Sequence, residues 1–262
     1  MSDVTSFNEE FTAEPSPEGT PPAPAAAVIP AAGLGLRLGP GAPKALRPLG
    51  GTPMLVHAVR AMARGRTIAL VVVVAPAEQL TLVRSLLDEH PPPPGVEQLV
   101  VAGGATRQES VRLGLAALPE SVGVVLVHDA ARPLVPVETV DAVTATVRAG
   151  APAVVPALPV TDTVKAIAHP GAPGEPEPVV ATPERALLRA VQTPQGFDRA
   201  TLLAAHEAAT SDLATDDAGL VERMGVEVVL VPGHEEAFKV TRPLDLLLAE
   251  AVLARRRIND GY

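Results

Sequence analysis

The sequence contains no cysteine and no tryptophan. The lack of cysteine excludes disulfide bonds, thiolate catalysis and zinc sites with sulfur ligands, and it is typical of a reducing compartment. Hydrophobic residues make up 47% of the chain, but aromatic residues make up only 2%. The core must therefore be packed mainly from alanine, valine and leucine. The length of 262 residues suits one large α/β domain with an elaboration.

Positive charge is also scarce, because 21 Lys and Arg residues face 30 Asp and Glu residues and give a formal net charge of -9. A nucleic acid polymer requires a broad basic face, so we expect no such partner, and any phosphate binding must be local. The longest apolar run, residues 67–77, is far shorter than the roughly 20 residues of a membrane helix. The N-terminus has no secretory signal pattern. We expect a cytoplasmic protein that does not insert into membranes.

Residues 1–25 are rich in Pro, Glu, Ser and Thr, and this composition predicts a disordered tail. Residues 26–262 are expected to form the domain. Apolar runs without polar alternation, typical of buried parallel strands, alternate there with helical patterns, which predicts a Rossmann-like, doubly wound, mainly parallel sheet. Thr52 and Pro53 are expected to be the N-cap and first residue of a helix. Strands are expected near residues 67–76, 96–101, 122–128, 153–156 and 226–232, and helices near residues 54–63, 77–89, 106–118, 137–149, 198–209 and 244–256.

The α/β pattern breaks between about residues 158 and 191. The turn-rich stretch HPGAPGEPEP, residues 169–178, lies there between two short extended segments and predicts a projecting β-hairpin arm. The arm is too polar and turn-rich to complete the sheet. Its extended flanks favour pairing with a second copy, as expected of an arm used for dimerisation.

A glycine-rich loop, AAGLGLRLGPGAPK at residues 31–44, follows the first apolar run. Small residues expose backbone amides that cradle phosphates, and Arg37 and Lys44 would flank a triphosphate lying over them. Lys44 is one of only three lysines, with Lys165 and Lys239, in a chain that otherwise uses arginine. The alternative is an ordinary surface loop with solvated charges.

Three further stretches carry polar residues next to predicted strands or helices. VLVHDAARP, residues 125–133, places Asp129 at a strand end, where we expect it beside a divalent cation, the alternative being a capping or turn aspartate. AGGATRQESV, residues 102–111, suits recognition of a base and ribose, although a tight turn explains it equally well. In FKVTRPLDL, residues 238–246, Lys239 would reach a phosphate or is simply a solvated charge. His57, His90, His169, His206 and His234 share no ligand spacing.

These motifs, together with DTVK, TPQGF and ATDD, occur in the order found in the 2-C-methyl-D-erythritol 4-phosphate cytidylyltransferases, which the chain resembles from about Val28 to the C-terminal helix. The resemblance implies a homodimeric, magnesium-dependent enzyme of the non-mevalonate isoprenoid pathway. Such an enzyme joins CTP to methylerythritol phosphate, a sugar-alcohol phosphate, and releases diphosphate.

The resemblance also implies roles for individual residues. Arg37, Lys44, Arg185 and Lys239 are expected to be catalytic, the first two as transition-state stabilisers. Asp129 is expected to bind both the metal ion and the substrate, and the arm of the neighbouring subunit is expected to supply Thr163 and Arg185. The expected nucleotide-binding residues are Ala31, Ala32, Gly33, Gly35, Gly104 and Ser110, and the expected substrate-binding residues are Asp129, Thr163, Arg185, Thr215 and Lys239.

The sequence departs from the family pattern at Ala105, where many members carry an acidic residue. Any contact with the base at this position must therefore be made through the backbone. Two alternatives stay open: a cytidylyltransferase for another polyol phosphate, such as ribitol 5-phosphate, and a non-catalytic nucleotide-binding protein on the same fold.

Overall fold

The structure is a computed structural model that describes residues 23–33, 43–172, 174–209 and 214–259. Most of the predicted tail, residues 1–22, lies outside them. The first strand, β1, begins at Ala25, one residue before the predicted start of the domain. Ala25 is fully buried, so it belongs to the core rather than to a tail.

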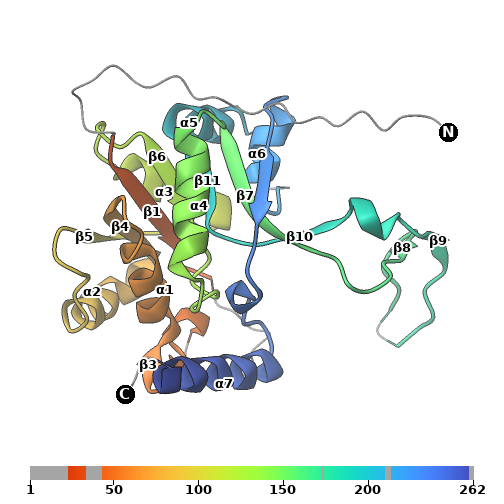
Figure 1. Ribbon diagram of the computed structural model, residues 1–262, viewed down its shortest axis with the longest axis horizontal. Coiled ribbons are helices and arrows are strands. Elements are labelled where there is room, and N and C mark those ends of the chain that lie inside the picture. The colour runs from red at the N-terminus through yellow and green to blue at the C-terminus, as the bar shows by residue number, and fades with distance from the viewer. Residues whose placement is uncertain (1–22, 34–42, 173, 210–213, 260–262) are drawn as a thin grey trace.

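The described residues form an eight-stranded, mainly parallel sheet flanked by helices, which confirms the predicted Rossmann-like α/β fold (Figure 1). The strand order is β10-β7-β11-β6-β1-β4-β5, and β12 also pairs with β7. Within this sheet, β10 and β11 are the strands that pair antiparallel to their neighbours. The strands are β1 (Ala25–Pro30), β4 (Ile68–Ala75), β5 (Glu97–Ala102), β6 (Val124–Val127), β7 (Ala153–Pro159), β10 (Arg189–Val191), β11 (Gln195–Asp198) and β12 (Val229–Pro232).

Helices cover both faces of the sheet because successive strand residues point to opposite sides. In β1, Ala25, Ala27 and Ile29 pack on the side of α1, α2 and α4, whereas Ala26 and Val28 pack on the side of α3, α5 and α6. The small side chains of β1 allow close packing in a core with few aromatic residues. The helices are α1 (Met54–Ala63), α2 (Leu80–Asp88), α3 (Arg107–Ala116), α4 (Val137–Arg148), α5 (Arg199–Ala208), α6 (Ala218–Arg223) and α7 (Pro243–Asn259).

Two local predictions near the first helix and the sheet centre were wrong or incomplete. Thr52 does not cap α1: Thr52–Pro53 form the short strand β3, which pairs with β2 (Pro48–Leu49), and α1 begins at Met54 without a side-chain cap. The two-residue loop between these strands is Gly50–Gly51, with φ of 58° and 82°, which suits a tight hairpin. The strand β11 was not predicted from TPQGF at all.

The arm leaves the body after β7 and returns at β10, as Figure 1 shows on its right-hand side. Its outer part is a hairpin of β8 (Ala166–Ile167) and β9 (Val179–Ala181), which confirms the predicted hairpin. The flanks, however, pair within the chain, Arg189 with Pro159 and Val191 with Ala157. The expectation that the arm is too polar and turn-rich to complete the sheet was therefore wrong for its returning end, because β10 continues the ladder along β7.

Helix α7 packs beside the β2–β3 hairpin, and Figure 1 shows it along the lower side of the molecule. Leu49, Met54, Leu134, Val240 and Ala249 form a small buried cluster between them. Glu250 accepts a hydrogen bond from the amide of Gly50 at 2.8 Å. Among the helices described, none is long and apolar enough to span a membrane.

Candidate active site

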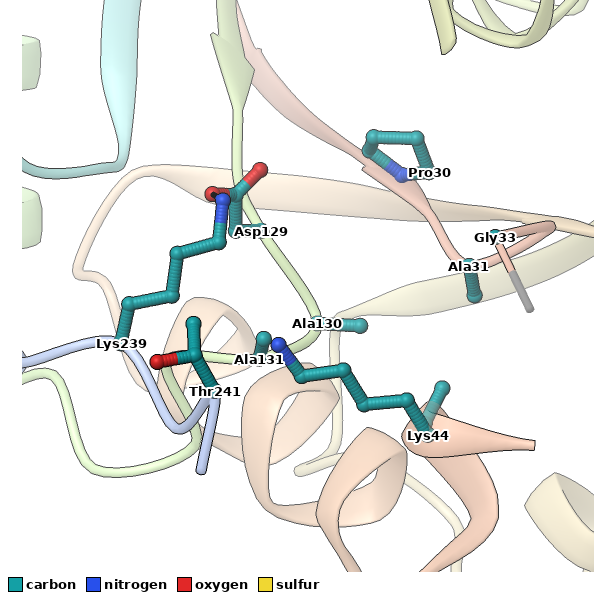
Figure 2. Close-up of a pocket in the computed structure, with 10 residues that line it drawn as sticks. Pro30, Ala31, Gly33, Lys44, Asp129, Ala130, Ala131, Lys239 and Thr241 are labelled. Atoms are coloured by element: carbon teal, nitrogen blue, oxygen red, sulfur yellow. Dashed lines mark ion pairs between the residues drawn. The ribbon is translucent and has the colours of Figure 1, made fainter. Parts of the chain in front are cut away.

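A cavity of about 190 Å³ lies at the carboxyl ends of β1 and β6, where ligands gather in open α/β sheets (Figure 2). Its floor is backbone and small side chains from the two strand ends. Lys44, from the 3₁₀ turn η2 (Lys44–Leu46), and Lys239, from the segment before α7, extend their ammonium groups into it. The cavity is lined by Pro30, Ala31, Gly33, Lys44, Ala45, Asp129, Ala130, Ala131, Lys239 and Thr241.

Asp129 is the charged centre of this cavity. Its Oδ2 lies 2.7 Å from Nζ of Lys239 and 4.0 Å from Nε of Arg132, and its Oδ1 lies 3.8 Å from Nε of Arg107. Burial raises the pKa of this carboxyl group, but Lys239, Arg107 and Arg132 outweigh burial and hold the pKa at about 2. Asp129 is therefore ionised at neutral pH, and three cationic side chains surround its single negative charge.

The residue before it, His128, fixes the backbone of Asp129. His128 is fully buried; its Nε2 lies 3.1 Å from the carbonyl oxygen of Arg132, and its Nδ1 lies 3.0 Å from Oγ1 of Thr193. Because a carbonyl oxygen can only accept, Nε2 carries the proton and Nδ1 accepts from the hydroxyl of Thr193. The same hydroxyl oxygen accepts from the amide of Asp129 at 3.0 Å. Burial lowers the pKa of His128 to about 4, so the ring is neutral.

A second cavity, about 200 Å³, shares Pro30, Gly33 and Asp129 with the first, so the two form one continuous site. Gly104 and Ser110 line it and contact each other: the amide of Gly104 donates to Oγ of Ser110 at 3.2 Å. A Cβ on Gly104 would lie 2.2 Å from Cδ of Glu109, so a larger residue there requires that side chain to move.

The turn before α3 is held by its own side chains. Thr106 caps the helix by accepting from the amide of Glu109 at 3.1 Å, and the carboxylate of Glu109 accepts from the amide of Ala105 at 2.8 Å. The backbone amide of Ala105 therefore already has a hydrogen-bond partner in Glu109.

The structure brings together many, but not all, of the residues singled out from the sequence. Ala31, Ala32, Gly33, Lys44, Gly104, Ser110, Asp129 and Lys239 line the two joined cavities. Gly35 and Arg37 lie outside the described residues. Thr215 is exposed and lines neither cavity, although it adjoins Asp216, whose carboxylate accepts from Nε2 of Gln195 at 2.6 Å.

Thr163 and Arg185 line neither of the two joined cavities. Both are exposed on the arm, and Nη1 of Arg185 donates to the carbonyl oxygen of Thr161 at 2.6 Å. Arg185 lines a separate open cavity together with Pro159, Thr161 and Arg189.

The sequence pointed to Arg107 at a helix start and to Arg132 at a strand end without assigning either a supporting role, and it missed Thr193 and Asp217 as supporting residues. Arg132 donates to the carbonyl oxygen of Ala237 at 2.6 Å and to that of Val191 at 3.3 Å, and so ties the Asp129 turn to the Lys239 segment and to β10. All four occur inside motifs quoted above, but their partners lie far away in the sequence. Motif membership was the only signal.

Metal binding by the protein alone is not supported by a ligand cluster. Within the described ranges, no three His, Cys, Asp or Glu side chains are grouped to hold a metal ion. One ionised carboxylate facing a cavity nevertheless fits Mg²⁺, which is commonly held by one or two carboxylates together with substrate phosphates. Asp129 is that carboxylate.

The carboxyl edge of this mainly parallel sheet carries two lysines, an ionised aspartate and glycine-containing turns. Such an edge is typical of α/β proteins that bind phosphorylated ligands, a class that includes the nucleotidyltransferases. The comparisons with known proteins narrow this class. Residues 25–255 match the family described as IspD, 2-C-methyl-D-erythritol 4-phosphate cytidylyltransferase. The chain therefore belongs to the family of 2-C-methyl-D-erythritol 4-phosphate cytidylyltransferases, which are nucleotidyltransferases.

Individual relatives agree with this assignment. A 2-C-methyl-D-erythritol 4-phosphate cytidylyltransferase of Streptomyces coelicolor is 72% identical over 93% of this chain and 90% of its own length. The enzyme of that name from Frankia casuarinae is 55% identical over 88% of this chain and 81% of its own. The crystal structure of the Thermus thermophilus enzyme is similar with a TM-score of 0.68 and 38% identity, covering 88% of this chain and 99% of that one.

Proposed function

We propose that this protein transfers the cytidylyl group of CTP to 2-C-methyl-D-erythritol 4-phosphate and releases diphosphate. The observation that carries the proposal is the joined site, in which Lys44, Lys239 and Asp129 surround one cavity and Gly104 and Ser110 line the next. Family membership supports the substrates, because the relatives carry this name. A cytoplasmic location stays a prediction from the sequence.

The reaction requires alignment and charge neutralisation more than proton transfer. An oxygen of the acceptor phosphate forms a bond to the α-phosphorus of CTP, while the bond from that phosphorus to the leaving diphosphate breaks. The acceptor phosphate is already ionised at neutral pH, so no general base is needed. In this proposal Lys44 and Arg37 neutralise the developing charge on the α-phosphate, and Lys239, whose side chain is 40% exposed, binds the acceptor phosphate.

Mg²⁺ is the divalent cation we propose for the site. When bound, it would neutralise oxygens of the triphosphate, and Asp129 would be its protein ligand. Asp129 Oδ2 contacts Lys239 at 2.7 Å, so this lysine must release the oxygen when it turns to a phosphate.

We also propose that the protein is a homodimer in which each arm serves the partner's site. Val179, Val180 and Leu187 are apolar residues of the arm with 55%, 61% and 77% of their surface exposed, as expected of a surface that a second subunit covers. Thr163 and Arg185 lie on the same arm, away from Asp129 of their own chain. Supplied by the partner, Arg185 would bind the acceptor phosphate through its planar fork.

Diphosphate release tests this function directly. The purified protein is incubated with methylerythritol phosphate and each of the four ribonucleoside triphosphates, and then with CTP and ribitol 5-phosphate. We expect turnover with CTP and methylerythritol phosphate that is lost in excess EDTA and restored by Mg²⁺. Faster turnover of ribitol 5-phosphate would establish the other polyol-phosphate activity, and no diphosphate release with any pair would overturn the enzymatic proposal.

A further inference from the structure

Arg107, the first residue of α3, lies between two carboxylates that come from distant parts of the chain. Its Nη2 lies 2.8 Å from Oδ2 of Asp217, just before α6, and its Nε lies 3.8 Å from Oδ1 of Asp129. Its side chain is 35% exposed. The close contact is thus with Asp217, and the looser one is with the carboxylate of the active site.

Asp217 is held from its other side by a second buried group. Its side chain is 1% exposed, and its Oδ1 lies 3.0 Å from Nε2 of His206, which is 2% exposed. The Asp217 Oδ2 atom has no aligned hydrogen-bond donor within the described residues, so its charge there is balanced by the ion pair with Arg107. Neither Asp217 nor His206 is accessible to a substrate.

Asp129, by contrast, divides its two oxygens between cations. Oδ2 pairs with Lys239 at 2.7 Å, and Oδ1 faces Arg107 at 3.8 Å. If Arg107 lost Asp217, its guanidinium would be free to close the remaining gap to Asp129 and to compete with Lys239. Asp217 therefore controls how strongly Arg107 acts on the reaction centre.

We propose that Arg107 is a positioning residue for this reaction, anchored by the buried Asp217–His206 pair so that it orients Asp129 without displacing Lys239. The proposal rests on the proposed function. This role requires a planar guanidinium, which faces the two carboxylates through different nitrogens. A compact ammonium does not offer that geometry.

The first test reads Lys239 directly and needs no enzymatic activity. Only Lys44, Lys165 and Lys239 are lysines, so acylation by a limiting water-soluble active ester is assigned peptide by peptide, with exposed Lys165 as internal reference. In Asp217→Asn, we expect Lys239 labelling relative to Lys165 to rise about twofold to fivefold, because Arg107 competes for Asp129. In Arg107→Gln, we expect it to fall by a similar factor, because Lys239 then has Asp129 to itself.

These opposite signs separate positioning from simple loosening of the fold. If both variants raise Lys239 labelling, or neither changes it, the proposal is overturned. The matched control is Asp141→Asn, which removes the 2.8 Å ion pair between Arg66 and α4 and should leave Lys239 labelling unchanged.

The second test is kinetic, with wild-type turnover of CTP and methylerythritol phosphate measured beside every variant. Loss of a partner that orients a functional ligand typically costs about 10-fold to 100-fold, and we expect that reduction in kcat/KM for the acceptor in Arg107→Gln and in Asp217→Asn. The KM for CTP should change by less than about threefold. An inactive wild type would refute the proposed function instead, and the labelling result would still stand by itself.

Two further variants keep the kinetic test decisive. The double variant Arg107→Gln/Asp217→Asn should be no worse than the more impaired single variant, because both changes remove one unit. Arg107→Lys keeps the charge on a partly exposed side chain, so it should fold even if Asp217→Asn does not, and it should be impaired nearly as much as Arg107→Gln. Multiplicative losses in the double variant, or full activity in Arg107→Lys, would contradict the bridging role.

Discussion

The cavity at the sheet edge and the arm hold their charged residues in opposite ways. In the cavity, Asp129 lies within 4.0 Å of three cations and its backbone is fixed by a buried histidine. On the arm, Arg185 is exposed and donates to the carbonyl oxygen of Thr161, close to it on the same arm. The charges of the cavity are arranged within one chain, whereas the arm presents its guanidinium to the outside, where another molecule can reach it.

One chain is enough to arrange the charges of the cavity, whereas in the proposed dimer the arm acts only when a second subunit is present. Preorganised charge acts strongly because little has to be rearranged at the moment of reaction, and in the proposed reaction the rearrangement in the cavity is that Lys239 leaves Asp129. A charge on a projecting arm must first be placed, and in the proposed dimer the second subunit places it.

Lys44→Ala should have the largest effect. Removing one preorganised cation from the reacting phosphate should lower kcat by about 100-fold to 1000-fold, with the melting temperature unchanged. Lys44→Arg should also be impaired, because a planar guanidinium does not occupy the place of a compact ammonium. Steady-state kinetics and thermal unfolding check both variants, with exposed Arg66→Ala as control. Near-normal turnover in a folded Lys44→Ala protein would contradict the proposed catalytic role of Lys44.

His128 should make the stability of the body depend on pH. Its folded-state pKa is lowered from 6.5 to about 4, so between these values only the unfolded chain binds the proton and stability is lost as pH falls from about 6.5 to 4. The full shift corresponds to about 3 kcal/mol. Asp129, whose pKa is lowered from 3.8 to about 2, contributes stability that is fully present throughout this pH range and is lost only as pH falls from 3.8 to 2.

Urea unfolding followed by circular dichroism measures this dependence, since the chain has no tryptophan. Wild type should lose stability across the window, and His128→Asn should show a flatter profile. Equal slopes for the two proteins would mean that His128 titrates normally in the folded state.

Mixing two inactive proteins tests whether the arm serves the partner's site. Arg185→Ala and Lys44→Ala should each be nearly inactive. Random exchange of equal amounts makes about half of the dimers mixed, each with one intact site of two, so activity should recover to about a quarter of wild type. A fully exchanged mixture that stays at the level of its parents would place Arg185 in its own subunit or outside the reaction.

The main sheet was predictable because its strands are buried on both faces. Such strands read as unbroken runs of Ala, Val and Ile, and parallel strands bring their carboxyl ends to one edge. The same rule predicts that Asp129 and the end of the first strand lie at one edge of the sheet. The place of Lys44 does not follow from it, because Lys44 lies in the turn η2 and not at a strand end.

Strand β11 could not be predicted, because its four residues, QGFD, contain a glycine that weakens the strand pattern. The structure explains the glycine: a Cβ at Gly196 would lie 2.4 Å from Cγ1 of Val143, so α4 can pack on the sheet only where a side chain is missing. A close approach of this kind depends on a helix from another part of the chain. The pairing of Arg107 with Asp217 could not be predicted for the same reason, because it depends on how α3 and α6 meet.

The docking of α7 also affects when the site is finished during synthesis. All strands of the main sheet and all the helices that cover it precede α7 in the described chain, so the nascent polypeptide can assemble them first. The segment that carries Lys239 is fixed by the amide of Val240, which donates a hydrogen bond to the carbonyl oxygen of Ala131 at 2.8 Å, and by the cluster that buries Ala249. A nascent chain with a complete sheet thus still lacks a fixed Lys239, and in the proposed function the ability to bind the acceptor arises only after α7 has left the ribosome.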